Sequence, residues 1–467
     1  MDILNEVLTE FDDAVGIELN VDPLGLLVIW STYGQNIFRH RISSISNDVR
    51  NFTLNLFNHA VIRSLIEDDE VVLGKGLRNL PAYGERGKDS AAFKQACLIY
   101  LENAFTYTMI EAQSQNGVET TGVLGISKAR RRWDETQGNP PLRFSHESNA
   151  HILVRQHSLG VSGRYKTPLV EMKFFDGTYD YALPESRVQW EKVRMQLLAK
   201  SKPLANLYNL TQKHLAELLT DAHRIPECNF SDLPRELKRA FVAAFSSPAT
   251  VGEYTHDFWL EVTDLNQGAP GALYKVLELE WKSTSQHQER QTAGVFALAA
   301  ANRSLSIAEK TKLEYVCVLE PFLAEIDLML SVMLSAKSQT LVEATNKWRS
   351  LGRTARTLPD SALLIRDNPN IQAQTSGTAS ARLTELLLLA CSENIEQQME
   401  GLLRYHEKVM QARSQSPWLR LVGGIQLKVD VRTRQLPTRN ERPVGAWVHH
   451  YYIPQFRHLL SGMRGIV

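Results

Sequence analysis

The chain has 467 residues with 52 basic and 52 acidic side chains, so its formal net charge is zero. An apolar fraction of 43% and a charged fraction of 22% are those of an ordinary globular protein, which excludes a disordered chain, and the length favours two or three domains. Because the charge is balanced, any affinity for nucleic acid has to come from local basic patches.

The cysteines and the first residues bear on the compartment. Cys97, Cys228, Cys317 and Cys391 are scattered without a Cys-x-x-Cys pair, which favours free thiols in a reducing compartment. Met1–Glu6 is polar and acidic, unlike a signal peptide, and no run of about 18 apolar residues occurs. We therefore expect a cytoplasmic protein that makes no contact with a membrane.

The first segment, residues 1–116, is predicted to be helical. In residues 51–67 and 90–113 the apolar side chains recur every three or four positions, as on one face of a helix. Residues 74–87 hold four glycines and one proline, which predicts a loop between these helices.

The second segment, residues 117–225, is predicted to be mixed. Recurring glycines break it, and the short apolar stretches 152–154 and 169–175 are candidate strands. Helical spacing returns in residues 185–200 and 210–222.

The third segment, residues 226–321, follows a proline-flanked linker and opens with an amphipathic helix over 233–245. Three apolar or alternating stretches then predict strands, and an alanine-rich stretch over 286–303 predicts a helix. The expected strands are 256–262, 274–282 and 313–319.

The last segment, residues 322–467, is predicted to be mainly helical, with a short hairpin over 419–431 and an aromatic block over 447–456. The side chains of this block are expected to pack a core or a partner surface. The whole chain is thus predicted to be a helix-rich, multi-domain, mixed α/β protein. Its expected divisions are 1–116, 117–225, 226–321 and 322–467.

The strand predicted over 274–282 has an unusual pattern. Alternation places Glu278, Glu280 and Lys282 on one face and apolar side chains on the other. Three charged side chains in a row are costly to bury, so this face either lines a wet, metal-binding cleft or faces solvent.

The order of these elements resembles the core of the PD-(D/E)XK nuclease superfamily, a restriction-endonuclease-like α/β fold, over about residues 235–320. A helix precedes a strand that opens with Asp257, and the next strand ends with Glu280-Trp281-Lys282. A polar helix and a third strand follow.

The resemblance implies roles for particular residues. Asp257 and Glu280 would bind Mg²⁺ through carboxylate oxygens, with Asp264 as a rival ligand. Lys282 would orient the attacking water, and Gln288 or Gln291 would supply a further polar contact. It also implies a Mg²⁺-dependent DNA nuclease, active or degenerate, in a bacterial restriction or anti-phage defence system.

A separate basic cluster lies at the start of the mixed segment. It consists of Lys128, Arg130, Arg131 and Arg132, followed by Trp133. Guanidinium groups bind phosphates and an adjacent indole can stack on a base, so the cluster is a candidate nucleic-acid contact. The alternative is a solvated helix face.

A second basic stretch, Arg155–Lys166, combines Gly160 and Gly163 with the cations Arg155, Arg164 and Lys166. Glycine-rich backbone with cations nearby can hold a phosphate, and the alternative is a structural turn. Together the two stretches make residues 117–185 the predicted nucleic-acid-binding module, with DNA as the expected ligand.

A second hypothesis needs no catalysis. The charged strand face would be surface, and the chain would be a nucleic-acid- or protein-binding subunit of a larger defence or DNA-processing complex. The sequence has no Walker A loop, Gly-x-Ser-x-Gly elbow, Rossmann fingerprint or His-Glu-x-x-His motif that would favour another enzyme class.

Overall fold

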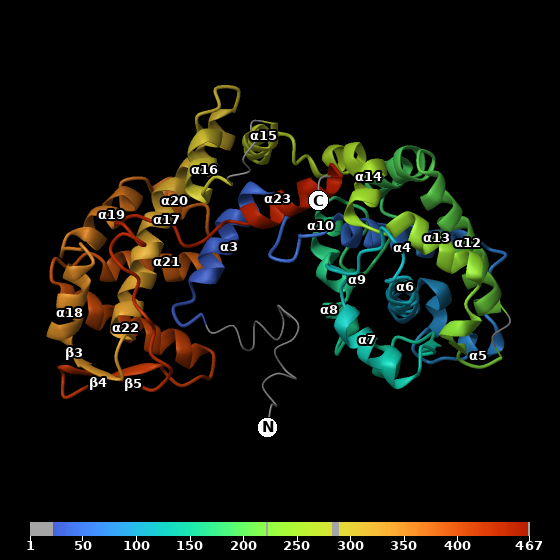
Figure 1. Cartoon of the computed structure of the whole chain (residues 1–467), viewed down its shortest axis with the longest axis horizontal. Coiled ribbons are helices and arrows are strands. Elements are labelled where there is room, and N and C mark those ends of the chain that lie inside the picture. The colour runs from blue at the N-terminus through green and yellow to red at the C-terminus, as the bar shows by residue number, and fades with distance from the viewer. Residues whose placement is uncertain (1–21, 221–222, 283–288, 466–467) are drawn as a thin grey trace. The chain divides into compact units, whose positions relative to one another are not determined.

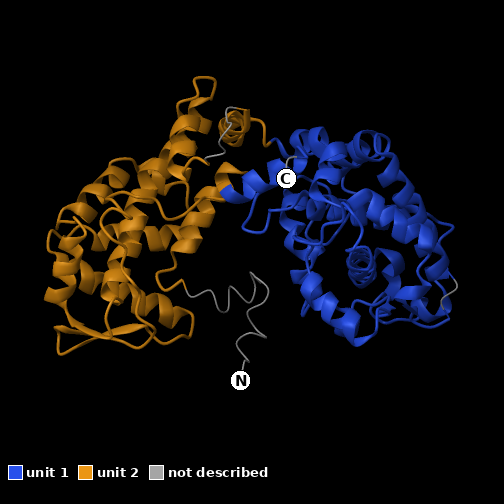
Figure 2. Ribbon diagram, viewed as in Figure 1, with its two compact units in different colours: residues 1–16, 40–264, 454–467 blue, residues 17–39, 265–453 orange. Residues whose placement is uncertain are grey.

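The computed structural model describes residues 22–220, 223–282 and 289–465. It is helix-rich, with 61% of the chain helical and only small antiparallel sheets, as the sequence predicts. The chain divides into two compact units (Figure 2), and each is made from segments that are distant in sequence. Unit 1 comprises residues 1–16, 40–264 and 454–467, and unit 2 comprises residues 17–39 and 265–453.

These boundaries do not coincide with the four segments expected from the sequence. Segments 1–116 and 117–225 contribute mainly to unit 1, whereas segment 226–321 is divided between the units after Asp264. No helix in the described ranges is long and apolar enough to cross a membrane.

Unit 1 is almost entirely helical, with one two-stranded antiparallel sheet in which β1 pairs with β2. Its elements are labelled in Figure 1. They are α4 (Val49–Glu67), α5 (Lys75–Arg78), η1 (Gly84–Asp89), α6 (Ala91–Glu111), α7 (Ile126–Glu135), β1 (Pro141–Arg143), η2 (Ser148–Ala150), α8 (Gln156–Leu159), α9 (Val161–Arg164), α10 (Lys166–Glu171), α11 (Ser186–Lys192), η3 (Val193–Leu198), α12 (Lys202–Thr220), β2 (Glu227–Asn229), η4 (Phe230–Asp232), α13 (Arg235–Phe245), α14 (Pro248–Thr263) and α23 (Ile453–Met463).

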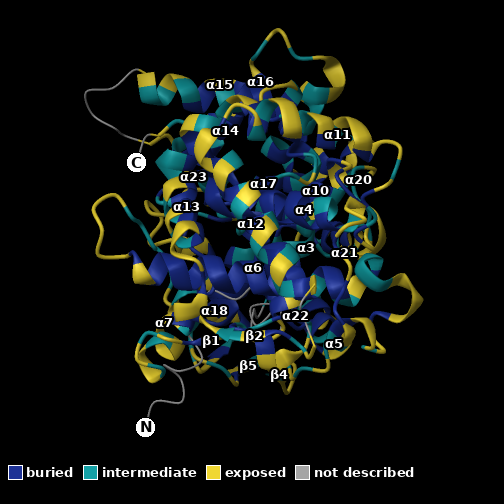
Figure 3. Ribbon diagram, turned by 90° about the vertical axis from the view of Figure 1, so that its right-hand side faces the viewer, coloured by how far each residue is buried: buried dark blue, intermediate teal, exposed yellow. Residues whose placement is uncertain are grey.

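The core of unit 1 is built around α4 and α6. Almost every residue of both helices is buried, and α6 is drawn largely in the buried colour in Figure 3. A helix that is buried on all sides must be surrounded by others. Helices α9, α12 and α14 pack on α4, while α7, α8 and α13 pack on α6.

The last helix of unit 1, α23, meets α14 at very short range. A Cβ atom added to Gly252 would lie 2.0 Å from the carbonyl oxygen of Gly462. The absence of a side chain at Gly252 therefore permits the two helix backbones to approach.

Unit 2 contains a three-stranded antiparallel sheet in the order β3-β5-β4 beside its helices. The strands β4 and β5 confirm the hairpin predicted over 419–431. The elements are α3 (Leu26–Ile37), α15 (Gly268–Lys282), α16 (Thr292–Ala300), α17 (Ile307–Met333), β3 (Ser338–Thr340), α18 (Leu341–Ser350), α19 (Thr357–Arg366), α20 (Pro369–Gln372), α21 (Gly377–Leu389), α22 (Ile395–Ala412), β4 (Leu419–Val422) and β5 (Gln426–Val429).

Helix α17 is the centre of unit 2, and α3, α15, α16, α18, α19 and α22 all pack on it. Its buried Glu320 accepts hydrogen bonds from Trp30 Nε1 and the Tyr451 hydroxyl, both at 2.7 Å. The backbone N–H groups of Val448 and His449 also donate to it, at 2.8 and 2.9 Å. This carboxylate therefore fastens the aromatic block to α17, and Tyr451 is fully buried, as expected of a core residue.

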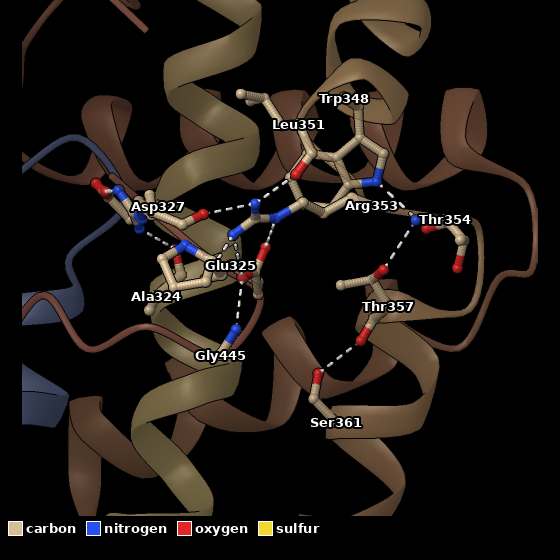
Figure 4. Close-up of polar contacts among 12 residues, drawn as sticks. Ala324, Glu325, Asp327, Trp348, Leu351, Arg353, Thr354, Thr357, Ser361 and Gly445 are labelled. Carbon is tan, nitrogen blue, oxygen red and sulfur yellow. Dashed lines mark hydrogen bonds and ion pairs between the residues drawn. The ribbon is translucent and has the colours of Figure 1, made fainter. Parts of the chain in front are cut away.

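A second buried carboxylate of α17 lies further along the helix (Figure 4). Arg353 donates to both oxygens of Glu325, at 2.9 and 2.8 Å, and also to the carbonyl of Arg442 at 2.7 Å. The N–H of Gly445 completes the shell of Glu325 at 3.1 Å. Removing one partner of such a buried pair leaves an uncompensated charge, so the pair fixes the path of the residues around Gly445.

Two of the predicted strands around the nuclease-like motif are wrong, because both stretches are helical. Residues 256–262 lie within α14, which starts at the Ser247 N-cap with Pro248 in its first turn. Residues 274–282 end α15, where Val276 and Leu277 are buried and Lys282 pairs with Glu278 one turn back, at 3.3 Å. An alternation this short also fits helical spacing, and in α14 the Ser247 cap favours the helix.

The third strand of the motif is wrong for a similar reason. Residues 313–319 belong to α17, whose apolar side chains also recur at helical spacing, and Pro321 lies inside this helix instead of ending an element. The candidate strands 152–154 and 169–175 are likewise absent, since turns and α10 occupy these positions.

Candidate nucleic-acid interface

The residues predicted to be catalytic lie on helices and not on neighbouring strands. Asp257, on α14, is 99% exposed and contacts only its neighbour His256 among the ion pairs of the described residues, at 2.8 Å. Glu280 is half-buried on α15, and Lys282 is exposed at its end. Gln291 is the exposed N-cap residue of α16, and Gln288 lies outside the described residues.

The two Mg²⁺ ligands predicted from the sequence, Asp257 and Glu280, belong to different units. Asp257 and its rival Asp264 belong to unit 1, whereas Glu280 belongs to unit 2, and each unit is described by itself. Within the described ranges, no group of three or more His, Cys, Asp or Glu side chains is arranged to hold a metal ion. The shared ion remains a prediction from the sequence.

The basic cluster forms the exposed face of α7. Arg130 donates to the Thr120 hydroxyl at 2.6 Å, and Arg131 pairs with Glu135 at 3.1 Å. Lys128 is half-buried. Arg130 and Arg131 thus contact the loop before α7 and α7 itself, whereas Arg132 bonds the Tyr107 hydroxyl on α6.

The indole of Trp133 is half-buried and contacts other aromatic rings. It packs inside unit 1, edge-on to Phe230 at 5.2 Å and near Tyr107 at 6.4 Å between ring centroids. A stacking contact between this side chain and a nucleic-acid base stays a prediction from the sequence.

The second basic stretch is mainly a structural turn. Lys166 donates to the carbonyl of Gly177 at 2.6 Å and lies 4.2 Å from the Tyr179 ring centroid. Arg164 is half-buried at the end of α9. A Cβ at Gly160 would lie 2.3 Å from the buried Glu102 carboxylate, so Gly160 permits close packing and does not cradle a ligand.

One residue from each basic stretch, Arg132 and Arg155, lines a common cleft of about 430 Å³. We call this the basic cleft. It lies where α7 approaches the loop before α8 in the teal part of Figure 1. No acidic side chain is part of its described lining. The full lining is Arg132, His146, Ser148, His151, Ile152, Leu153, Val154, Arg155 and His157.

Buried amides hold the loop wall of the basic cleft against α6. Asn103 donates to the carbonyl of Ala150 at 2.7 Å, and Gln156 accepts from the N–H of Ile152 at 2.7 Å. The Gln156 amide in turn donates to Asn103 at 2.9 Å and to Glu102 at 3.2 Å. Fully bonded buried networks are rigid, so the wall is fixed before any ligand binds.

The electrostatics of the basic cleft are positive. Burial lowers the pKa of His151, the hydrogen bond to the His146 carbonyl opposes this fall, and electrostatic interactions with His157, Arg132 and His146 lower the pKa further. The His151 and His157 rings are 6.0 Å apart, and His151 Nε2 lies 3.2 Å from the His146 carbonyl. The two guanidinium groups, with no acid in the described lining, make the basic cleft favourable for an anion.

Unit 2 has a groove with a larger volume than the basic cleft of unit 1, but its acidic and basic side chains balance. It has a volume of about 710 Å³ between α21 and α22. Its cations are paired within the groove, Lys408 with Glu385 and Arg404 with Glu400 at 3.7 Å. It therefore has no excess charge to attract a nucleic acid.

Sequence reasoning identified Arg132 and Arg155 but missed the histidines of the basic cleft. His146, His151 and His157 fall within twelve positions that also include Arg155. This local density of histidine and arginine was the sequence signal that could have indicated the cleft. Comparison of the chain with protein-family models, curated proteins and solved structures gives no match, so the cleft is interpreted from its own residues.

Proposed function

We propose that this chain is a non-catalytic nucleic-acid-binding subunit and that the basic cleft is its contact site. The observation that carries the proposal is the convergence of Arg132 and Arg155 with three histidines on one cleft whose described lining has no acid. Guanidinium groups bind phosphate oxygens through paired hydrogen bonds, and imidazoles add donors.

The size and rigidity of the cleft support the same conclusion. A volume of about 430 Å³ suits a nucleotide-sized group, and the amide network around Gln156 holds the wall in place. DNA and RNA are both compatible with these contacts, because phosphate contacts carry no sequence information.

Binding to labelled single-stranded and duplex oligonucleotides, measured by fluorescence anisotropy at low salt, tests the proposal. We expect Arg132→Ala, at an exposed position in the last turn of α7, to weaken binding about tenfold or more, because it removes a charge-assisted phosphate contact. Arg155 has a φ of 55°, a backbone region that asparagine tolerates, so Arg155→Asn removes the charge with little strain.

The matched control is Arg131→Ala. This residue is also an exposed arginine of α7, but it pairs with Glu135 and does not line the basic cleft. Its loss should change affinity less than about twofold. Equal losses for Arg131→Ala and Arg132→Ala would sink the proposed site.

The nuclease hypothesis predicts metal-dependent DNA cleavage, which a second assay measures. Purified protein is incubated with plasmid DNA and Mg²⁺ or Mn²⁺, beside Asp257→Ala, Glu280→Ala and Lys282→Ala. We expect no cleavage by any of them. Metal-dependent cleavage that disappears in Glu280→Ala or Lys282→Ala would replace the proposal with a catalytic function.

A further inference from the structure

We infer that the basic cleft is a pocket for one terminal phosphomonoester of a nucleic acid and not a track for its phosphodiester backbone. This inference rests on the proposed function and specifies its ligand. It follows from where the basic side chains of residues 117–185 lie.

A backbone track needs a row of cations along one surface, whereas the basic cleft gathers two of the seven predicted basic residues at one place. Of the seven basic residues indicated by the sequence, Lys166 bonds a carbonyl and Arg131 pairs with an acid, while Arg130 and Arg132 each bond a hydroxyl, that of Thr120 and that of Tyr107. Arg132 and Arg155 alone among the seven line the basic cleft. The positive charge is thus gathered at one place, enough for about one phosphate group.

The donors in the basic cleft match a phosphomonoester better than a diester. A phosphomonoester carries a charge of about −1.5 to −2 at neutral pH and has three terminal oxygens, so it needs more donors than a singly charged diester. Arg132, Arg155, His146, His157 and Ser148 supply guanidinium, imidazole and hydroxyl donors around one volume.

The walls of the cleft define a closed back and an apolar rim. His151 is 6% exposed, and its ring is bonded within the loop, so it fixes the shape of the back wall. Leu153 is half-buried and Val154 is 79% exposed beside Arg155. An apolar rim next to a phosphate pocket offers contact for the sugar or base of a terminal nucleotide.

The test compares one short single-stranded oligonucleotide in three forms: with a 5′-phosphate, with a 3′-phosphate, and with hydroxyls at both ends. We expect one or both phosphorylated forms to bind about tenfold or more tightly than the hydroxyl form, because only they present the dianion. His157→Ala and Arg132→Ala should remove this preference, whereas Arg131→Ala should retain it.

The outcomes of this test distinguish failure of the terminal-phosphate inference from failure of the proposed function. If the three forms bind equally but Arg132→Ala still weakens all of them, the terminal-phosphate inference is overturned and the proposed function stands. If none of them binds, both fail. Thermal unfolding of each variant, compared with Arg131→Ala, shows whether a loss comes from misfolding.

The same phosphate chemistry occurs in a free nucleotide. Competition by AMP and by inorganic phosphate identifies the source. Competition by AMP within about tenfold of the phosphorylated oligonucleotide supports the pocket and assigns it to a mononucleotide. Much weaker competition, with the end preference intact, supports the pocket and assigns it to a polynucleotide end.

Discussion

Glu320 shows how one buried side chain makes the stability of unit 2 depend on pH. Burial raises its pKa from 4.5 to about 7, although four hydrogen-bond donors partly offset this cost. The folded chain therefore holds a proton at Glu320 more tightly than the unfolded chain does. The stabilisation from this proton is complete below pH 4.5 and is lost as the pH rises through about 7.

We expect Glu320→Gln to flatten the pH dependence of the free energy of unfolding between these values. Each pKa unit corresponds to about 1.4 kcal/mol. The change in the free energy of unfolding between pH 4.5 and about 7 should therefore be smaller by roughly 3 kcal/mol in the variant. Urea denaturation of the whole chain at a series of pH values measures it. The control is Glu314→Gln, which changes an exposed acid of the same helix. A slope in Glu320→Gln equal to that of the native chain would contradict the prediction.

At the same scale, single residues explain why the candidate site was only half predictable. The guanidinium groups of Arg132 and Arg155 stood out because charge density is visible in a sequence. Gln156 and Asn103, which position the cleft wall, are ordinary polar residues until the fold places them together. Hydrogen bonds between residues 53 positions apart have no local signal.

Among elements, the short helices α8 and α9 pack against the buried network that holds the wall of the basic cleft. They meet at Gly160, where a Cβ atom would lie 2.3 Å from Glu102 and 2.7 Å from the carbonyl of Gln156. Both neighbours are buried, and Gln156 belongs to the network that holds the cleft wall.

Gly160→Ala should therefore destabilise the chain by about 1–3 kcal/mol and weaken phosphate binding, because the added methyl group pushes the wall away from α6. Gly177→Ala is the control, since nothing lies within 4 Å of a Cβ added there. Thermal unfolding and oligonucleotide binding measure the two effects. An unchanged affinity in a destabilised Gly160→Ala variant would show that the wall does not position the site.

The elements also show where sequence patterns suffice. Helices α4 and α6 were predictable because they are long and apolar at helical spacing. In α15, the nine residues 274–282 satisfy both alternation and helical spacing, so the pattern alone does not decide. Helix α15 begins at Gly268–Gly271, where glycine and proline predict a turn, so no helix start was evident from the sequence.

For the whole molecule, 52 basic and 52 acidic residues give a net charge of zero, so the proposed nucleic-acid binding depends on the local charge of the basic cleft. A pocket for one phosphate releases few counterions. We therefore expect the logarithm of the binding constant to fall with the logarithm of salt concentration with a slope of about −1 to −2.

Anisotropy titrations over a series of salt concentrations measure this slope. A protein with six to ten phosphate contacts would give a several-fold steeper one. A steep slope here would mean that a longer stretch of backbone is bound, in agreement with a track. Addition of EDTA should leave the affinity unchanged, because the proposed phosphate contacts use the side chains of Arg132 and Arg155 and no metal ion.

The interleaved division of the chain sets an order of events during translation. Unit 2 is complete when the ribosome has passed Ile453, whereas unit 1 still lacks α23. Until that helix emerges, the surface of α14 around Gly252, shaped to meet the backbone at Gly462, stays uncovered. A nascent chain that stalls shortly after Ile453 would thus expose this face of α14 to chaperones.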